Sequence, residues 1–228
     1  MDRPYIHINC ASTLDGKIAR PDGSRLRISG EHDMERVHRL RAEIGAVLVG
    51  AGTVINDDPK LTVKEKFVPD PPKLTKIILD GKGLIPASSR FLRTEGTSLI
   101  ATSDSCSGEW FESITEAIEH DDLDAEVLML PGVDDVLDLS NMLEELNRMR
   151  VGSVLVEGGS STISQFVSKD LFDIMTIYYG PMFIGGSGPT IMGGDGSMNN
   201  ISSVDIEEVR RTEDGGVLVT VRPSNISR

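Results

Sequence analysis

The chain has 228 residues, of which 39% are hydrophobic and 26% are charged. A chain of this length and composition forms one domain, whose core needs neither a metal ion nor a disulfide for stability. Acidic residues outnumber basic residues by 36 to 23, so the net charge is −13. This charge repels nucleic-acid phosphates and anionic membranes and argues against both as partners. An anionic ligand therefore requires a local basic pocket.

The cysteine and histidine content predicts neither a disulfide framework nor a zinc site. Cys10 and Cys106 lie far apart in the sequence, and the four histidines are scattered. The first twenty residues carry charges instead of the apolar core of a signal peptide. No run approaches the ~18 apolar residues of a membrane span. We therefore expect a cytoplasmic protein without a metal, in which residues 1–228 form a single domain.

Short apolar runs rich in β-branched residues alternate with helical patterns along the whole chain. This alternation predicts an α/β fold with a mostly parallel central sheet flanked by helices. The predicted strands are Tyr5–Ala11, Ala46–Val49, Lys76–Leu79, Thr97–Thr102, Glu126–Leu130, Ser153–Val156 and Ile174–Tyr178. Val204–Thr212 and Val217–Val221 follow and flank a glycine-containing turn, which predicts a C-terminal antiparallel β-hairpin.

Three helices are expected between these strands. Ser29 is the expected N-cap of a helix over Glu31–Ile44. Apolar residues at helical spacing between Leu139 and Leu146 predict a second helix. The last of the three helices begins after Gly159 and continues through Val167. The apolar positions of the first helix are Met34, Val37, Leu40 and Ile44, interrupted by Arg41, and those of the second are Leu139, Met142, Leu143 and Leu146.

Four stretches with polar or glycine-rich sequence follow predicted strands, and ligands of α/β proteins bind at the carboxyl ends of strands. They are Ser12–Lys17, Val47–Pro59, Val154–Thr162 and Pro181–Thr190. The first brings hydroxyls, a carboxylate and Lys17 to the sheet edge, although a simple turn also explains it. The last is equally consistent with a flexible cover that has no chemical role.

The second and third stretches each join a strand to a helix through glycines. Gly50 and Gly52 precede Thr53, and Glu157 precedes Gly158–Gly159. Glycines let a ligand approach the backbone, and the amides at a helix start bind anions. Neither stretch is a dinucleotide fingerprint or a Walker loop. Two such elements in one sheet predict a ligand with more than one phosphate.

Arg41 and Lys64 are candidate contacts for the anionic tail of a substrate, although each is also consistent with a surface charge. With these residues in view, the sequence resembles the riboflavin-pathway reductase family. These are relatives of the C-terminal half of the bacterial bifunctional riboflavin deaminase/reductase. The most specific part of the resemblance is the block from Gly50 through Asp57–Pro59 to Leu61–Val63, and the match extends over essentially the whole chain.

The resemblance implies a dihydrofolate-reductase-like fold and a homodimer, with the Ile174–Tyr178 segment and the terminal hairpin as a candidate interface. No zinc deaminase motif is present, so the chain resembles the free-standing reductases of archaea and fungi. That branch implies 2,5-diamino-6-(5-phosphoribosylamino)pyrimidin-4(3H)-one as the substrate. Hydride would pass from NADPH, with NADH possible, to C1′ of the ring-opened imine and leave the ribitylamino product.

The resemblance also implies roles for individual residues. Lys17 would stabilise charge or deliver a proton, Asp57 would hold nicotinamide and ribose, and Glu157 would orient the substrate. The implied substrate contacts are Arg41, Leu61, Lys64 and Glu157. The implied cofactor contacts are Ala11, Gly50, Gly52, Thr53, Asp57, Thr102, Ser103, Gly158, Gly159, Ser160, Ser161, Thr162, Ile163, Ser164 and Gln165. Candidates for reading the 2′-phosphate are Lys82, Arg90 and Arg93.

The sequence departs from the pattern of the bacterial relatives at two positions, Lys64 and Arg27. Lys64 stands where bacterial relatives often have Arg, and Lys binds phosphate as a point charge instead of a bidentate fork. Arg27 stands where they often have Trp. Three alternatives remain: a true dihydrofolate reductase, a nucleotide-binding module without turnover, and a phosphoryl-transfer enzyme. The Arg41 and Lys64 cations favour a phosphosugar over a pterin, and the missing Walker lysine disfavours phosphoryl transfer.

Overall fold

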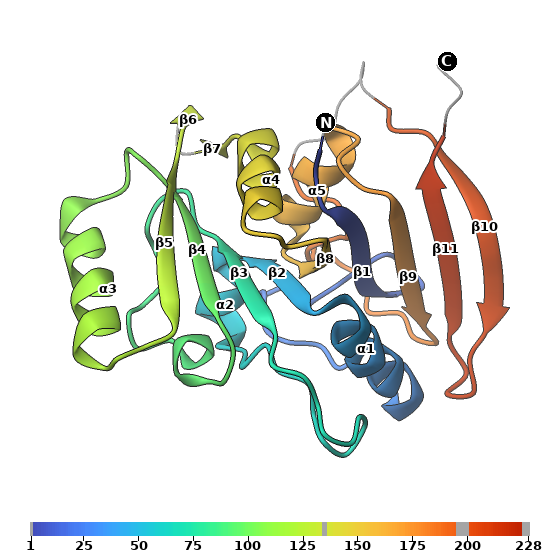
Figure 1. Ribbon diagram of the computed structural model, residues 1–228. Coiled ribbons are helices and arrows are strands. Elements are labelled where there is room, and N and C mark those ends of the chain that lie inside the picture. Colours follow the sequence, from blue (N-terminus) through green and yellow to red (C-terminus); the bar gives the residue numbers. More distant parts are fainter. Residues whose placement is uncertain (1, 134–135, 195–200, 225–228) are drawn as a thin grey trace.

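The computed structural model describes residues 2–133, 136–194 and 201–224 and has a nine-stranded sheet at its centre (Figure 1). The strand order is β10-β11-β9-β1-β8-β2-β3-β4-β5. The strands are β1 (Tyr5–Thr13), β2 (Ala46–Gly50), β3 (Thr75–Leu79), β4 (Ser98–Ser103), β5 (Ala125–Leu130), β8 (Ser153–Gly158), β9 (Ile174–Gly180), β10 (Val204–Arg211) and β11 (Val217–Pro223). All neighbours pair in parallel except β11, which is antiparallel to β9 and β10. The predicted parallel sheet and C-terminal hairpin are confirmed.

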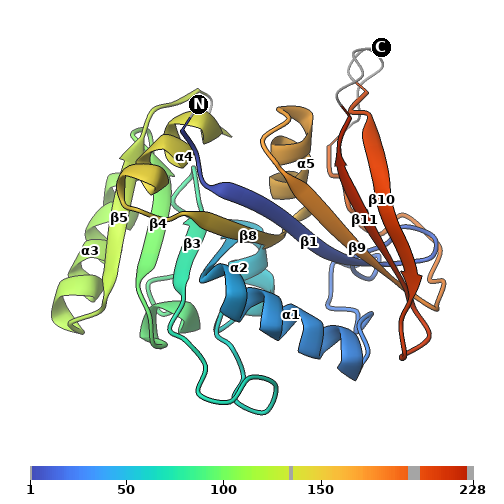
Figure 2. The ribbon, with the colours of Figure 1, turned by 45° about the vertical axis from the view of Figure 1, so that its right-hand side comes forward.

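Helices cover both faces of this sheet (Figure 2). They are α1 (Glu31–Ile44), α2 (Ala51–Asp57), α3 (Gly108–His120), α4 (Leu139–Arg148) and α5 (Ser160–Ser168), with a 3-10 turn η1 (Arg90–Arg93). A small ladder of β6 (Gly132–Val133) and β7 (Val136–Leu137) stands apart from the main sheet. The segment that forms α3 carries no helix among the sequence-based predictions. None of the helices within the described ranges is long and apolar enough to cross a membrane.

Two hydrophobic cores lie on opposite faces of the central strands, because successive side chains of a strand point to opposite sides. Leu48 and Ile77 belong to the core under α4 and α5, whereas their neighbours Val47 and Ile78 belong to the core that includes α2 and α3. This explains why these strands are apolar at nearly every position. The apolar positions predicted for α4 are all fully buried, as expected.

The first helix departs from its prediction. Its N-cap is Gly30, not Ser29, whose hydroxyl instead donates to the side chain of Asp33. The N–H of Asp33 donates to Oδ2 of Asp214 at 3.1 Å, so the hairpin turn supplies the cap. The fully buried side chains of α1 are Asp33 and His38, while its predicted apolar stripe is only half-buried.

Several strands also extend beyond their predicted ends. The ladder between β1 and β9 continues through Ser12 and Thr13, which pair with Tyr179 and Gly180. Strand β8 likewise runs on through Glu157 to Gly158. Backbone pairing with a neighbouring strand holds these polar residues extended, and neighbouring strands are not visible in a single sequence window. The extensions bring the polar strand ends to the same edge of the sheet.

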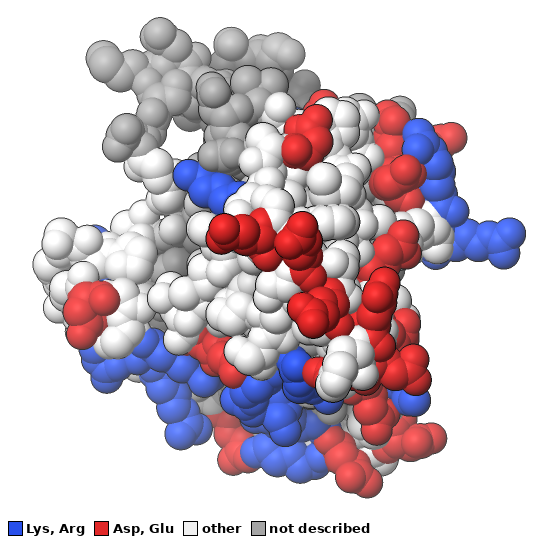
Figure 3. All heavy atoms as spheres, turned by 90° about the vertical axis from the view of Figure 1, so that its left-hand side faces the viewer, with Lys and Arg blue, Asp and Glu red and all other residues white. Residues whose placement is uncertain are grey.

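The surface agrees with the acidic composition. Figure 3 shows the face on the α3 side, where acidic side chains cover much of the surface and basic side chains gather along its lower edge. On this face basic side chains therefore gather locally, although the protein is acidic as a whole.

Lys76 is an unusual member of the core because its side chain is fully buried within β3. Its Nζ donates to the carbonyl oxygens of Phe91 and Thr94, both at 2.7 Å. These bonds tie η1 to the sheet. Burial lowers the pKa of Lys76 from 10.5 to about 8.

We expect Lys76→Met to lower the free energy of unfolding by about 2 kcal/mol or more, because two buried carbonyls lose their donor. Between pH 8 and 10.5 the unfolded state binds more protons at this lysine than the folded state, so its contribution to stability rises with pH. Urea unfolding at several pH values measures both effects. As the pH rises through this range, the free energy of unfolding of wild type minus that of the variant should grow by at most about 1.4 kcal/mol per pH unit. The exposed Lys73, changed to Met, is the control and should show no such pH dependence.

Candidate functional site

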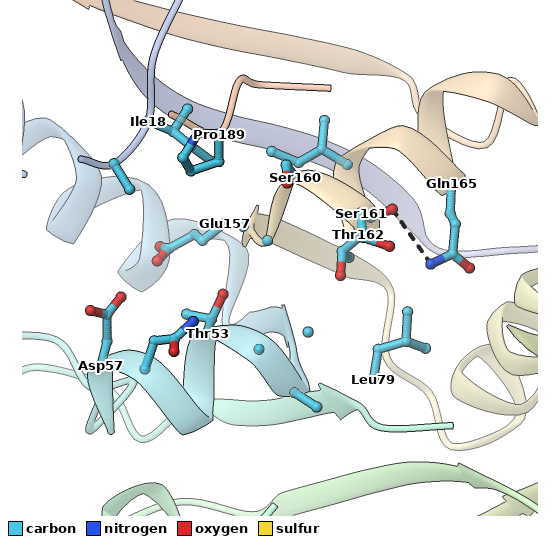
Figure 4. A pocket seen from close by; sticks show the side chains of 18 of the residues that line it. Ile18, Thr53, Asp57, Leu79, Glu157, Ser160, Ser161, Thr162, Gln165 and Pro189 are labelled. Atoms are coloured by element: carbon cyan, nitrogen blue, oxygen red, sulfur yellow. Dashed lines mark hydrogen bonds between the residues drawn. The ribbon is translucent and has the colours of Figure 1, made fainter. Parts of the chain in front are cut away.

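The carboxyl ends of β1, β8, β2 and β3 open into a cleft of about 630 Å³ (Figure 4). Figure 4 shows that Glu157 and Asp57 lie toward one end, near Ile18 and Pro189. Leu79 and Gln165 lie toward the other end, and Thr53 and the start of α5 lie between them. The cleft therefore has two ends joined by a middle built from two strand–helix turns.

The two glycine turns interlock at the middle of the cleft, because β2 and β8 are neighbours in the sheet. A side chain at Gly50 would overlap the hydroxyl of Thr162. In return, a Cβ at Gly159 would lie 3.6 Å from the hydroxyl oxygen of Thr53. Gly158 and Gly159 also adopt φ values of 153° and 79°, which side chains disfavour. The two turns, which the sequence placed in one sheet, therefore form one surface.

This surface fits an anionic group with more than one phosphate. The first turn of α5 leaves backbone N–H groups without partners inside the helix, and Ser160, Ser161 and Thr162 line the cleft there. A Cβ at Gly52 would meet nothing within 4 Å, so the backbone there is open to a ligand. Donors from two elements can then bind adjacent phosphates, as a dinucleotide requires.

The end of the cleft near Glu157 contains a buried ion pair. Arg41 on α1 donates from Nε to Oε1 of Glu157 at 2.6 Å and from Nη2 to Oε2 at 2.5 Å. Its Nη1 donates to the carbonyl oxygen of Thr62 at 2.8 Å. The two side chains are 16% and 10% exposed. Burial lowers the pKa of Arg41, but the charge of Glu157 and its hydrogen bonds more than offset this, so the pKa of Arg41 is raised.

The pairing changes how the two residues can act. Glu157 lines the cleft, whereas Arg41 lies behind it and is not among the described lining residues. The guanidinium fixes the direction of the carboxylate through two charge-assisted hydrogen bonds. Arg41 is therefore placed to position Glu157, and its predicted direct contact with substrate stays a prediction.

The other predicted substrate contacts lie outside the described lining of the cleft. Leu61 is buried in the core, with a φ of 52°. Lys64 is exposed, and its backbone N–H donates to Nδ1 of His38 at 3.3 Å. Burial, followed by the charges of Arg41, Lys64 and Lys66, lowers the pKa of His38 to about 4. Three cations thus surround His38, beyond the Glu157 end of the cleft.

Lys17 also lies outside the described lining, although its neighbour Ile18 is part of it. The backbone N–H of Lys17 donates to the hydroxyl of Thr13, and Lys17 forms a β-bridge with Thr190. Asp15 accepts the N–H of Gly185 at 2.7 Å. These bonds join the loop after β1 to the glycine-rich loop after β9, and the two loops form one wall of the cleft.

Most of the predicted cofactor contacts do line the cleft. They are Ala11, Gly50, Gly52, Thr53, Asp57, Gly158, Gly159, Ser160, Ser161, Thr162, Ile163 and Gln165. Ser164, Thr102 and Ser103 do not belong to the described lining. The last two are buried in β4, and the hydroxyl of Thr102 has no hydrogen-bond partner among the described residues. Their contact with a cofactor stays a prediction.

Sequence reasoning missed much of the far end of the cleft. Asp80, Gly81, Lys82 and Leu84, which follow β3, line it. The signal was present, because a polar glycine-containing stretch follows a predicted strand here too. Of these residues, only Lys82 was among the candidate contacts.

The cleft contains neither a reactive thiolate nor a cluster of metal ligands among the described residues. Cys10 lines the cleft, but burial raises the pKa of its thiol to about 12, so it stays protonated. The described part of the chain holds no group of three histidine, cysteine or carboxylate residues that could bind a metal. The arrangement favours binding and orienting a phosphorylated cofactor.

Comparison with known proteins agrees with this geometry. The profile of the RibD C-terminal domain matches residues 4–218. The chain belongs to this family. It is 38% identical to the 2,5-diamino-6-ribosylamino-4(3H)-pyrimidinone 5′-phosphate reductase of Archaeoglobus fulgidus, across 93% of this chain and 95% of the relative. The reductase of the same name from Methanothermobacter thermautotrophicus is 33% identical, across 90% of this chain and 91% of the relative.

Solved structures of the family share the fold. The Thermotoga maritima diaminohydroxyphosphoribosylaminopyrimidine deaminase/5-amino-6-(5-phosphoribosylamino)uracil reductase superposes with a TM-score of 0.76 at 28% identity. The match covers 97% of this chain and 57% of that one. The Saccharomyces cerevisiae riboflavin biosynthesis reductase Rib7 superposes with a TM-score of 0.71 at 19% identity. That match covers 98% of this chain and 91% of the yeast protein. The expected dihydrofolate-reductase-like fold is confirmed.

The buried ion pair leads to a test by double-mutant cycle. We expect Arg41→Met and Glu157→Gln each to lower the free energy of unfolding by about 2–3 kcal/mol, because each leaves a buried polar partner. The double variant should lose less free energy of unfolding than the sum of the two single losses. The difference, which is the coupling energy of the pair, should be about 1 kcal/mol or more. Urea unfolding at pH 7 measures all four proteins. Additive losses would show that the two charges do not interact.

Proposed function

We propose that the chain is the NADPH-dependent reductase that converts the ribosylamino side chain of 2,5-diamino-6-(5-phosphoribosylamino)pyrimidin-4(3H)-one to the ribitylamino product. The observation that carries this proposal is the pair of interlocked glycine turns, which fits a pyrophosphate. The names of the relatives from Archaeoglobus and Methanothermobacter support the substrate. The reduced nicotinamide supplies the hydride for C1′ of the ring-opened sugar.

The residues of the chain bind and orient the reactants. Thr53 and the start of α5 would hold the pyrophosphate in the middle of the cleft. Asp57 would then hold the nicotinamide and its ribose at the end of the cleft that also contains Glu157. Glu157, fixed by Arg41, accepts hydrogen bonds from polar groups of the substrate. Holding the two reactants in the right geometry lowers the entropic part of the barrier.

The substrate phosphate requires a cation, and the cluster around His38 provides it. Lys64 stands in this cluster with Arg41 and Lys66. The ammonium group of Lys66 already pairs with Glu31 and lies over the ring of Phe67. Lys64 lies on the same loop and is closer in sequence to Thr62, whose carbonyl oxygen binds Arg41. We infer that Lys64 binds the 5′-phosphate as a point charge. Lys17 remains the candidate for charge stabilisation or proton delivery.

A kinetic series tests the proposal. We expect NADPH absorbance to fall when the ribosylaminopyrimidine phosphate is added and to stay constant when dihydrofolate is added. A fall with dihydrofolate would indicate a dihydrofolate reductase. Glu157→Gln should lower kcat/KM at least about 100-fold, because it removes the charge that orients the substrate. Asp57→Ala should weaken binding of the cofactor. Lys64→Ala should raise the KM for the substrate about 10-fold.

Lys73→Ala is the matched control for Lys64, because Lys73 is an exposed lysine of the same loop between α2 and β3 and pairs with Glu95. An unchanged substrate KM in Lys64→Ala would contradict the phosphate assignment. Binding of NADPH without turnover of any of these substrates would favour a nucleotide-binding module over an enzyme.

We propose further that two copies associate through the terminal hairpin. Strand β10 is an edge strand, and all eight of its residues are exposed, including Ile206 at 66% and Val209 at 61%. An edge strand with uncovered apolar side chains readily pairs with another chain. The expected Ile174–Tyr178 segment lies inside the sheet, between β1 and β11, so the hairpin is the better candidate.

The double variant Ile206→Glu/Val209→Glu should therefore be a monomer where the wild type is a dimer. Charged residues on facing edge strands repel each other and prevent pairing. Light scattering coupled to size-exclusion chromatography measures both masses at equal concentration. A wild type that is monomeric at tens of micromolar would contradict the proposal, as would a variant that remains a dimer.

A further inference from the structure

The segment between α2 and β3 is held against α1 by two residues of that helix, and Figure 2 shows it passing close to α1. Nη1 of Arg41 donates to the carbonyl oxygen of Thr62 at 2.8 Å. Nδ1 of His38 accepts the backbone N–H of Lys64 at 3.3 Å. His38 and Arg41 are three residues apart in the helix and so lie on the same face. One face of α1 therefore fixes both the carboxylate of Glu157 and the backbone that carries Lys64.

The imidazole of His38 is suited to act as a permanent acceptor. The residue is only 2% exposed, and its ring stacks on that of Phe67 with a centroid distance of 5.0 Å. A ring nitrogen that accepts a hydrogen bond carries no proton, so the proton of the neutral ring is on Nε2. Burial, followed by the charges of the three neighbouring cations, lowers the pKa of His38 to about 4. At neutral pH the ring therefore stays uncharged and keeps the N–H of Lys64 as its partner.

The rest of the segment is ordered around this contact. The side chains of Leu61 and Val63 are buried in the core that includes α2. The N–H groups of Phe67 and Val68 both donate to the carbonyl oxygen of Lys64, at 3.0 and 3.1 Å. The side chain of Lys64 is exposed, and its ammonium has no hydrogen bond or ion pair with any other residue that the structure describes. The backbone of Lys64 is thus fixed while its charge remains available to an anion.

A fixed backbone matters for a lysine that binds phosphate. The ammonium is carried by a flexible side chain, and if the backbone beneath it also moves, both must be ordered when the anion binds. An acceptor at His38 removes the cost of ordering the backbone. Arg41 orders the same segment through Thr62, but it also holds Glu157, so its replacement cannot separate the two effects.

We propose that His38 is a positioning residue for the substrate phosphate, which it serves by fixing the backbone of Lys64 on α1. This inference rests on the proposed reductase function and on the binding of the 5′-phosphate by Lys64. His38 is buried and outside the described lining of the cleft, so it acts through Lys64. The phosphate is remote from the reacting C1′, and its contact binds ground state and transition state alike. Loss of His38 therefore raises KM and leaves kcat nearly unchanged.

Two variants of His38 separate its acceptor from its ring. His38→Phe keeps a ring against Phe67 but removes the acceptor, whereas His38→Asn places an amide oxygen near the position of Nδ1. We expect His38→Phe to raise the KM for the phosphorylated substrate about 5-fold, as for the loss of one hydrogen bond, with kcat changed less than about 2-fold. His38→Asn should restore most of the wild-type KM. His32→Phe is the matched control, because His32 is an exposed histidine in the first turn of the same helix, and should leave KM unchanged.

The substrate without its 5′-phosphate shows whether His38 acts through the phosphate. Wild type and His38→Phe should reduce this compound with the same kcat/KM and should bind NADPH equally, as nicotinamide fluorescence measures. In the Lys64→Ala background, His38→Phe should cause no further rise in the KM for the phosphorylated substrate, because the two residues act in series. His38→Gln, whose amide lies beyond the position of Nδ1, is a second variant without this acceptor and should behave as His38→Phe does. Urea unfolding verifies that each variant is folded at the assay temperature.

Three results with folded variants would overturn the role of His38. They are an unchanged KM in His38→Phe, an equal loss of kcat/KM for both substrates, and a rise in KM that persists in the Lys64→Ala background. In each case, turnover of the phosphorylated substrate by wild type would leave the reductase function standing. Failure of wild type to reduce that substrate with NADPH would overturn both.

Discussion

The close approach of β2 and β8 at their carboxyl ends is the constraint on which the candidate site depends. Gly50 has to lack a side chain because the Thr162 hydroxyl occupies that space, and Gly158–Gly159 turn in conformations that side chains disfavour. Larger residues at these positions would push the two strand ends apart. The joint surface in the middle of the cleft would then be lost, even if each strand and helix still formed. Packing of the backbone thus creates the binding surface directly.

This constraint also separates the cleft into two ends with different chemistry. At one end, an ion pair with little exposure holds the carboxylate of Glu157 in place, and three cations surround His38 just beyond it. At the other end, the carboxylate of Asp80 accepts the backbone N–H groups of Leu84 and Ile85 and so orders a loop that also brings Lys82 to the cleft. Both ends use a buried charged group to fix a neighbouring group that can contact a ligand. Such internal support is what keeps a site in its working geometry before a ligand binds.

The terminal hairpin connects the rest of the fold to this site. Asp214 in its turn caps α1, and α1 carries Arg41. Strand β11 pairs with β9, whose loop joins the loop after β1 to form a wall of the cleft. The last residues of the chain therefore stabilise elements that begin near its first residues. A second copy bound at β10 would act on the same framework.

The sequence by itself determined the class of fold and most of the middle of the site. Continuous apolar runs identified the parallel strands. Glycines after two of these strands identified the two turns in the middle of the cleft, because the backbone freedom of glycine is visible in local sequence. Local sequence did not show that Asp214 caps α1, that Arg41 points to Glu157, or that the loop after β3 completes the cleft. Each of these contacts joins residues far apart in the chain. Only the order of strands in the sheet decides which of them meet.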